Sequence, residues 1–178
     1  MKELTNGNPL KLIFLFTIPL LIGNIFQQFY NMADMIIVGQ TLGKNALAAV
    51  GATGSITFLI IGFAQGLTSG LSIITAQRFG ARDYQGVKKS FATGIIISIV
   101  VTVILTILSL VLVRPLLLVM QTPAEILDDA EIFISIILFG IFAAMAFNLL
   151  SNVIRALGDS RTPLVFLIIA SIVNVVLD

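Results

Sequence analysis

Two aspartates, Asp34 and Asp178, lie within stretches of sequence that otherwise lack charged side chains. A carboxylate in the middle of a membrane costs about 2.5 to 3.5 kcal/mol on insertion scales, so such residues usually mark a path for an ion, a proton or a substrate. Two carboxylates brought together in a medium of low dielectric cannot both ionise at low cost, so the pair would hold a proton or bind a cation. These residues therefore predict a site that couples to an ion gradient.

Polar side chains share a helical face with Asp34 if its surroundings are helical. At about 100° per residue, one arc contains Asn24, Gln27, Tyr30, Asn31 and Asp34. We expect this polar stripe to face the interior of a bundle.

Two further segments carry similar polar faces. Ser171 and Asn174 precede Asp178 on one face, and Asn148 and Asn152 lie four residues apart on another. Hydrogen bonding between helices is the alternative role for these groups, and it explains the pair at 148 and 152 at least as well as a binding site does.

The elements that must position these residues follow from composition. Charged residues make up 11% of the chain and apolar residues 58%, with a mean hydropathy of +1.10. Uncharged stretches cover 12–33, 45–77, 90–113 and 132–154. Each is long enough for a helix that crosses the hydrocarbon layer of about 30 Å, and none alternates as a barrel strand would. We predict an all-α, polytopic helical membrane protein with five transmembrane helices at roughly 9–39, 46–77, 88–113, 123–156 and 163–178.

Local signals support several of these helix ends. A capping residue followed by proline predicts helix starts at Asn8-Pro9, Thr122-Pro123 and Thr162-Pro163. Thr122 and Glu125 have the spacing of a capping box, and Gly80 and Gly158 are expected helix stops. In the second helix, Gly62, Gly66 and Gly70 predict close helix packing. The last apolar stretch ends without a polar exit, so we expect the protein to continue beyond residue 178.

The basic residues predict an orientation, because lysine and arginine concentrate in cytoplasmic loops. One side would hold Lys2, Lys11, Arg78, Arg82, Lys88, Lys89, Arg155 and Arg161, and the other only Lys44 and Arg114. We therefore predict a multi-pass protein of the plasma (inner) membrane with a cytoplasmic N-terminus. The acidic residues at 125, 128, 129 and 131 then lie outside, where we expect a solvated helix start. The chain has no cysteine and no histidine, which excludes disulfides, thiolate or imidazole metal sites and the common nucleophile pairs.

Four segments together resemble one family of membrane transporters. They are IPLLIGNIFQQFYNMADMIIVGQTLG, AQRFGARDY, NVIRALGDSRTP and NVVLD, in this order along the whole chain. They resemble the multidrug and toxic compound extrusion (MATE) family. The resemblance implies a twelve-helix secondary transporter, not an enzyme, made of two six-helix lobes. The present five helices would be an incomplete N-terminal lobe, with the second lobe absent.

The resemblance also implies functional roles. The family exports small organic, often cationic compounds in exchange for H⁺ or Na⁺. Its coupling residues correspond here to Asp34, Asn152, Asn174 and Asp178. Under Na⁺ coupling the metal ligands would be Asp34, Asn174 and Asp178. Gln27 and Tyr30 match positions in the substrate cavity of the family, and we assign Asn31, on the same helical face, to that cavity with them. No cofactor beyond the coupling ion is implied, and the expected partners are substrates, membrane lipid and the remaining helices of the full-length protein, with no nucleic acid.

Three alternatives compete with this reading. Flippases of lipid-linked saccharides belong to the same superfamily, but they usually line their cavity with several basic residues, and we expect no lysine or arginine inside these helices. An intramembrane aspartyl protease would resemble a Gly-x-Gly-Asp motif, whereas Ala156-Leu157-Gly158-Asp159 lies in a predicted loop. A membrane subunit without transport activity would use its polar residues for helix packing alone.

Overall fold

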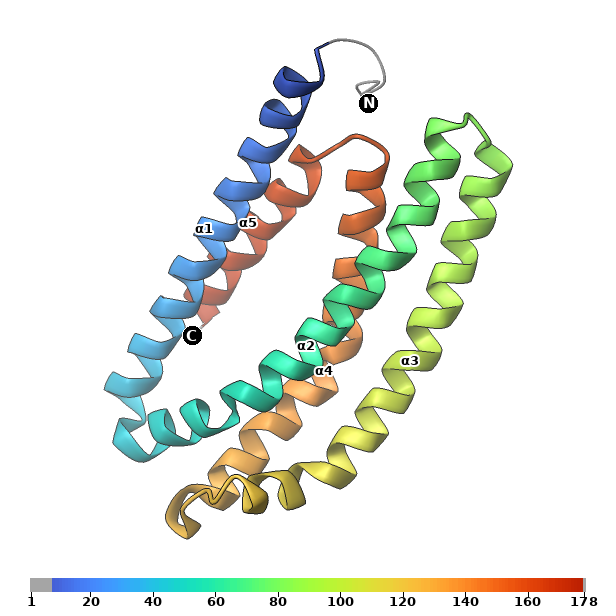
Figure 1. The fold of residues 1–178 in the computed structure, drawn as a ribbon. Helices are drawn as coiled ribbons and strands as arrows, with labels where there is room; N and C mark the ends of the chain where they lie inside the picture. Colours follow the sequence, from blue (N-terminus) through green and yellow to red (C-terminus); the bar gives the residue numbers. More distant parts are fainter. Residues whose placement is uncertain (1–7, 178) are drawn as a thin grey trace.

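A computed structural model describes the backbone of residues 8–177 and the side chains of residues 8–174. This part of the chain forms five helices and no strand (Figure 1). They are α1 (Pro9–Thr41), α2 (Gly43–Gly80), α3 (Tyr84–Val119), α4 (Ala124–Ala156) and α5 (Arg161–Leu177). Within the described residues, α1 to α4 are each long and apolar enough to cross a membrane. The predicted all-α helical membrane class is confirmed, and Asp178 lies outside the described residues.

The helices run further into their connections than the predicted ranges. α2 begins at Gly43 rather than near 46, and α3 extends from Tyr84 to Val119 rather than from 88 to 113. Charged side chains such as Lys88 and Arg114 therefore lie on helical turns. Their long apolar stems can cover helix surface while the charged group reaches water, so a charge did not mark the end of a helix here.

The helix caps agree with the sequence signals only in part. The Asn8 side chain accepts a hydrogen bond from the Leu10 N–H at 3.1 Å, as predicted. The predicted caps at Thr122 and Thr162 are wrong, because α4 begins after Pro123 without a side-chain cap and α5 begins at Arg161. At α5 the Asp159 carboxylate accepts from the N–H groups of Arg161 and Thr162 instead.

Of the two predicted helix stops, one is confirmed and the other is wrong. Gly158 has φ +87° directly after α4, which is the left-handed conformation that glycine adopts most easily. At the end of α2 this conformation falls on Arg82, at φ +58°, and Gly80 is simply the last helical residue.

The helices form two groups. α2, α3 and α4 pack against one another, while α5 packs mainly on α1 (Figure 1). The buried face of α2 recurs every three or four residues and consists mostly of small side chains: Ala49, Thr53, Ile56, Ile60, Ala64, Thr68 and Thr75. Small side chains let helices approach closely, and this stripe lies against α4. The predicted close packing at Gly62, Gly66 and Gly70 is not made by the described helices, because a Cβ added at any of the three would meet no other atom of the described chain within 4 Å.

The two ends of the bundle differ in charge and packing. One end, called the basic end, holds the start of α1, the α2–α3 turn and the α4–α5 loop, with Lys11, Arg78, Arg82, Lys88, Lys89, Arg155 and Arg161. The other end, called the opposite end, holds the α1–α2 and α3–α4 connections. The main apolar core lies towards the opposite end, where Leu117, Ala130 and Ile134 are fully buried. Large apolar side chains elsewhere face outwards, such as Phe58 with 81% exposure, as a lipid-facing surface requires.

Candidate functional site: a polar cavity between two helix groups

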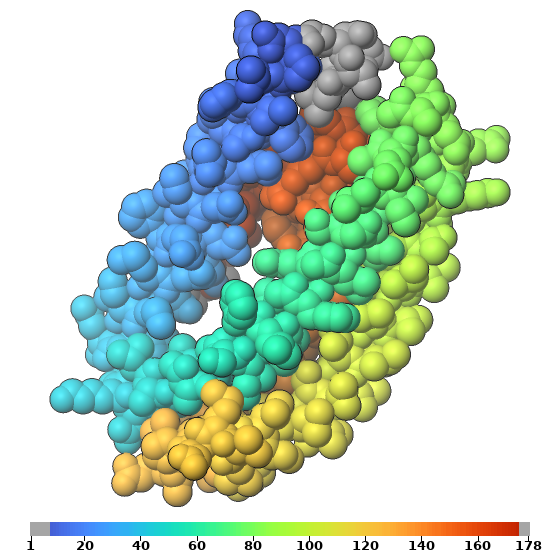
Figure 2. Space-filling model, viewed as in Figure 1, coloured from blue at the N-terminus to red at the C-terminus, as the bar shows by residue number. Residues whose placement is uncertain are grey.

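A cavity of about 800 Å³ lies between the α1–α5 pair and the α2–α4 pair. The space-filling view shows the molecule hollowed between α1 and α2, with atoms of the C-terminal helices visible behind (Figure 2). This volume is within the range of small-molecule sites. Although the four helices are apolar overall, they and the α4–α5 loop contribute many polar side chains to the cavity lining: Asn24, Gln27, Tyr30, Gln65, Ser69, Asn148, Ser151, Asn152, Arg155, Ser160, Ser171 and Asn174.

The close approach of α1 and α5 beside the cavity depends on Gly23. Gly23 is the buried residue of α1 within the described part of the chain, and a Cβ there would lie 3.4 Å from side-chain atoms of both Leu164 and Leu167. An added Cβ would make close van der Waals contact with these two leucines, and a longer side chain would need them to move. Gly23 therefore lies at the contact between the two helices that form one wall of the cavity.

Only part of the predicted polar stripe of α1 lines the cavity. Gln27 and Tyr30 line the cavity. Asn31 does not line it, because it is exposed and its side-chain amide donates to the Gln28 Oε1 at 3.4 Å. Asp34 lies one turn beyond Tyr30, partly buried and outside the cavity lining. The helical arc placed these residues roughly on one side, but it could not show where along α1 the neighbouring helices separate.

Asn152 lines the cavity and also joins two helices. Its Nδ2 donates to the Thr68 Oγ1 at 3.1 Å, and Thr68 is fully buried. Its Oδ1 accepts from the Arg155 Nη1 at 3.5 Å. Both polar atoms of Asn152 therefore face protein partners in this structure, and one of those partners is a cation.

Asn174 lies deeper in the cavity than Asn152. Along the helices, Asn152 is about 6 Å from the end of α4 and Asn174 about 20 Å from the start of α5, at a rise of 1.5 Å per residue. These two helix termini are joined by the short α4–α5 loop. The structure thus brings Asn152 and Asn174 to one cavity but at different depths, and Asp34 lies towards the opposite end of α1. The Asn174 Oδ1 is buried and has no hydrogen-bond partner among the described residues, so it is an acceptor that a bound cation or donor could use.

Arg155 is the cavity residue that the sequence analysis missed. It is partly buried, lies in the last turn of α4 and lines the cavity together with Asn152. The expectation that no basic side chain lies inside these helices is therefore wrong. One signal was present in the sequence, because Arg155 follows Asn152 by three residues and so shares its helical face.

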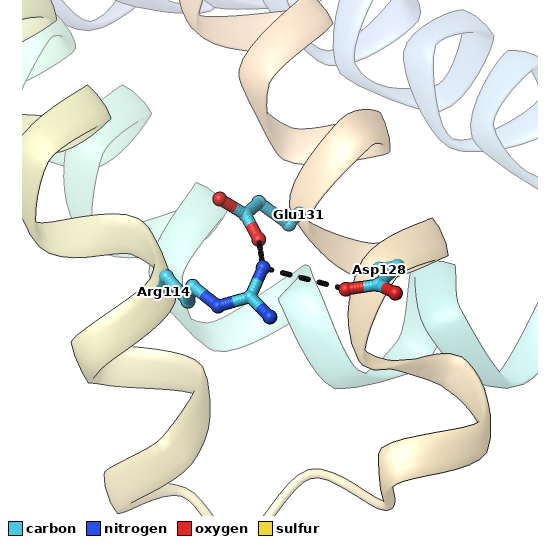
Figure 3. Close-up of polar contacts among 3 residues, drawn as sticks. All are labelled: Arg114, Asp128 and Glu131. Carbon is cyan, nitrogen blue, oxygen red and sulfur yellow. Dashed lines mark hydrogen bonds and ion pairs between the residues drawn. The ribbon is translucent and has the colours of Figure 1, made fainter.

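The opposite end carries a second arginine in a different setting. Arg114 of α3 forms ion pairs with Asp128, at 3.3 Å, and with Glu131 on the first turns of α4 (Figure 3). The acidic helix start that we expected to be simply solvated therefore joins α3 to α4. Arg114 and Asp128 remain well exposed, at 53% and 77%, so this pairing is a surface contact.

Two polar turns order the loops at the basic end. The Asp83 carboxylate accepts from the Gly86 N–H at 2.8 Å at the start of α3, and the Arg78 Nη1 donates to the Gly86 carbonyl at 3.3 Å. In the α4–α5 loop, the Thr162 hydroxyl donates to Asp159 at 2.6 Å. Hydrogen bonds from Thr162 lower the pKa of the Asp159 carboxyl below its ordinary value, because they stabilise the ionised form.

A bundle of apolar helices that encloses a polar cavity is typical of polytopic membrane proteins with an intramembrane polar site. The MatE family model matches residues 19–178, and the chain belongs to this family. It is 31% identical over 175 residues to the probable multidrug resistance protein YpnP of Bacillus subtilis (strain 168), covering 98% of this chain and 39% of that protein. It is 29% identical to the probable multidrug resistance protein YoeA of the same organism, covering 92% of this chain and 35% of YoeA.

Solved structures agree with this assignment. The crystal structure of MATE in the bent conformation has a TM-score of 0.88 and 34% identity, and covers 97% of this chain and 38% of that one. A MOP superfamily transporter from Pyrococcus furiosus has a TM-score of 0.88 and 33% identity, with 96% of this chain and 37% of that one covered. The present chain therefore spans less than two fifths of the proteins that it matches.

Proposed function

We propose that this chain is part of a cation-coupled antiporter that exports small organic compounds, many of them cationic, in exchange for H⁺ or Na⁺. The observation that carries the proposal is the polar cavity between apolar helices, in which the Asn174 Oδ1 is buried and has no hydrogen-bond partner within the part of the chain that the structure describes. The relatives named as multidrug resistance proteins support the substrate class. The excess of basic residues at the basic end favours a cytoplasmic position for that end.

The proposed coupling site contains Asp34 and Asn174, with Asp178 as a third ligand that lies outside the described residues. Carboxylate and amide oxygens suit both H⁺ exchange and Na⁺ coordination, so either ion fits the proposal. Binding of the ion would favour one conformation of the lobe, and the conformations would differ in their affinity for the exported compound. Gln27 and Tyr30 would contact that compound, because both line the cavity.

The test uses the full-length protein in sealed vesicles. Export of a cationic rhodamine methyl ester is measured under an imposed pH gradient and, separately, under an imposed Na⁺ gradient. One of the two gradients is expected to drive export, and Asp34→Asn is expected to abolish that gradient-driven part. Gln28→Ala is the matched control, since Gln28 is an exposed neighbour on α1 outside the cavity lining. Export that ignores both gradients, or that survives unchanged in Asp34→Asn, would contradict the proposal.

A further inference from the structure

Arg155 gives the cavity a positive charge that a purely cation-binding site would not need. Within the described residues it is the one ionisable side chain, apart from Tyr30, among those that line the cavity. No carboxylate in that part of the chain forms an ion pair with it. Its Nε is buried and has no hydrogen-bond partner among those residues. A guanidinium that is partly removed from water without a counter-ion is costly, so the side chain requires an explanation.

Capping of α4 does not provide this explanation. The carbonyl groups of Val153, Ile154 and Arg155 in the last turn already accept from backbone N–H groups of the following loop. The dipole of α4 favours a cation in its last turn, but that preference leaves the Nε donor unused. The hydrogen bond to Asn152, at 3.5 Å, is long and engages only Nη1.

The surroundings of Arg155 are suited to an anion. Ser151 and Ser160 also line the cavity and are only 5% and 7% exposed. Ser151 lies four residues before Arg155 and so shares its helical face, Ser160 lies in the loop that follows α4, and neither makes a side-chain hydrogen bond within the described part of the chain. Their hydroxyl groups can donate, and the guanidinium presents several donors in a planar arrangement that matches an oxyanion. The carboxylate nearest in sequence, Asp159, is engaged by Thr162 and Arg161, so it does not compete for Arg155.

We propose that Arg155, with Ser151 and Ser160, forms a subsite at the basic end of the cavity that binds the carboxylate group of an organic substrate. The inference rests on the proposed export function and specifies one group of its substrates, namely compounds that carry both a cationic centre and a carboxylate. The cationic centre would lie deeper, towards Asn174, while the carboxylate would lie against Arg155. The phosphate of a lipid headgroup has the same oxyanion chemistry, and the experiment separates the two sources.

Two dyes that differ only in this group test the proposal. A rhodamine with a free carboxylate is compared with its methyl ester, using the full-length protein in vesicles of neutral phosphatidylcholine. In Arg155→Gln, the ratio of kcat/KM for the acid over the ester is expected to fall about tenfold, the size of effect expected for one lost charge-assisted contact. Arg155→Lys, which retains the charge, is expected to recover part of the ratio. Arg114→Gln is the matched control at the opposite end and is expected to leave the ratio unchanged.

Each other outcome has a defined meaning. An equal loss for both dyes would show a structural role for Arg155 and overturn the subsite, as would no change in the ratio. An effect of Arg155→Gln that occurs only when anionic phospholipid is added would assign the guanidinium to a lipid headgroup and also overturn it. If the ester is not exported by the unmodified protein under either gradient, the proposed function fails, which is distinguishable from failure of the subsite alone.

Discussion

At the opposite end of the bundle, Arg114 lies on the surface between two carboxylates, whereas at the basic end Arg155 is partly buried and has no carboxylate partner among the described residues. The two ends also differ in how tightly their helices pack. The opposite end holds the main apolar core of α2, α3 and α4, and the basic end is opened by the cavity that α1 and α5 help to line.

This difference shows which charge needs a functional explanation. An exposed arginine that is paired with acids near the helix ends costs little and contributes little. A partly buried arginine without an acid is expensive unless something else neutralises it. The conformational freedom required for alternating access would also be expected beside the cavity rather than in the packed core.

The largest expected effect tests the difference in packing. Ile134→Ala is predicted to destabilise the protein by about 2 kcal/mol, because Ile134 is fully buried in the core of the opposite end and the truncation leaves a cavity. The matched substitution Ile169→Ala on α5, where the side chain is 51% exposed, should cost less than about 0.5 kcal/mol. Unfolding of the full-length protein in detergent measures both, and equal losses would remove the distinction between the two regions.

A second change makes the basic end resemble the opposite end. Asn152→Asp places a carboxylate where the Asn152 Oδ1 now accepts from Arg155, so the guanidinium gains an acid partner. The ratio of acid to ester dye transport is predicted to fall by about tenfold, because the substrate carboxylate loses its binding partner. Asn148→Asp, one turn further from Arg155 on the same face, is the control. An equal fall in Asn148→Asp would show that the total charge of the cavity matters rather than its pairing with Arg155.

A smaller effect is expected from the surface ion pairs. Glu131→Gln removes one partner of Arg114 and leaves Asp128 in place. The melting temperature is predicted to fall slightly at low ionic strength and to be indistinguishable from that of the unmodified protein at high salt, because salt screens exposed charges. A large loss that persists in high salt would mean that the α3–α4 pairing at the opposite end is structural rather than superficial.

The smallest effect concerns the loop beside Arg155. The lowered pKa of Asp159 stabilises the folded state above the ordinary pKa of an aspartate, and this contribution is lost as the pH falls through the lower, folded-state pKa. Thr162→Val removes the hydroxyl that helps to lower this pKa. The variant should be slightly less stable at neutral pH, and the difference should shrink on acidification below the ordinary range. A difference that grows with acidification would contradict this sign.

Several features of the fold were predictable because they depend on short segments. Uncharged stretches of sufficient length indicate membrane helices whatever their partners are, and the structure contains helices at all five predicted positions. The Asn8 cap and the Gly158 stop were also predicted, since each depends on a few neighbouring residues. The predicted cap at Thr162 was wrong because Asp159 accepts from the first N–H groups of α5 instead. The predicted cap at Thr122 was wrong because Pro123 holds the N-cap position of α4 and no side chain caps that helix.

The cavity could be predicted only in outline. The polar faces of α1, α4 and α5 indicated an interior site, and Gln27, Tyr30, Asn152 and Asn174 do line one cavity. Helical periodicity could not show that Asn31 faces away, or that Asn152 and Asn174 lie at different depths. The role of Asp178 stays a prediction, because that residue lies outside the described part of the chain.

The all-helical membrane class and the resemblance to the MatE family can be read from the sequence, since apolar length and short motifs are local properties of the chain. Three features required the folded arrangement: α2 packs on α4 through threonine and alanine rather than glycine, Asn152 bonds to Thr68 across 84 positions, and Arg155 lines the cavity. These outcomes depend on how helices cross and rotate about their axes. That geometry results from many weak side-chain contacts between distant segments, and no single segment contains the information.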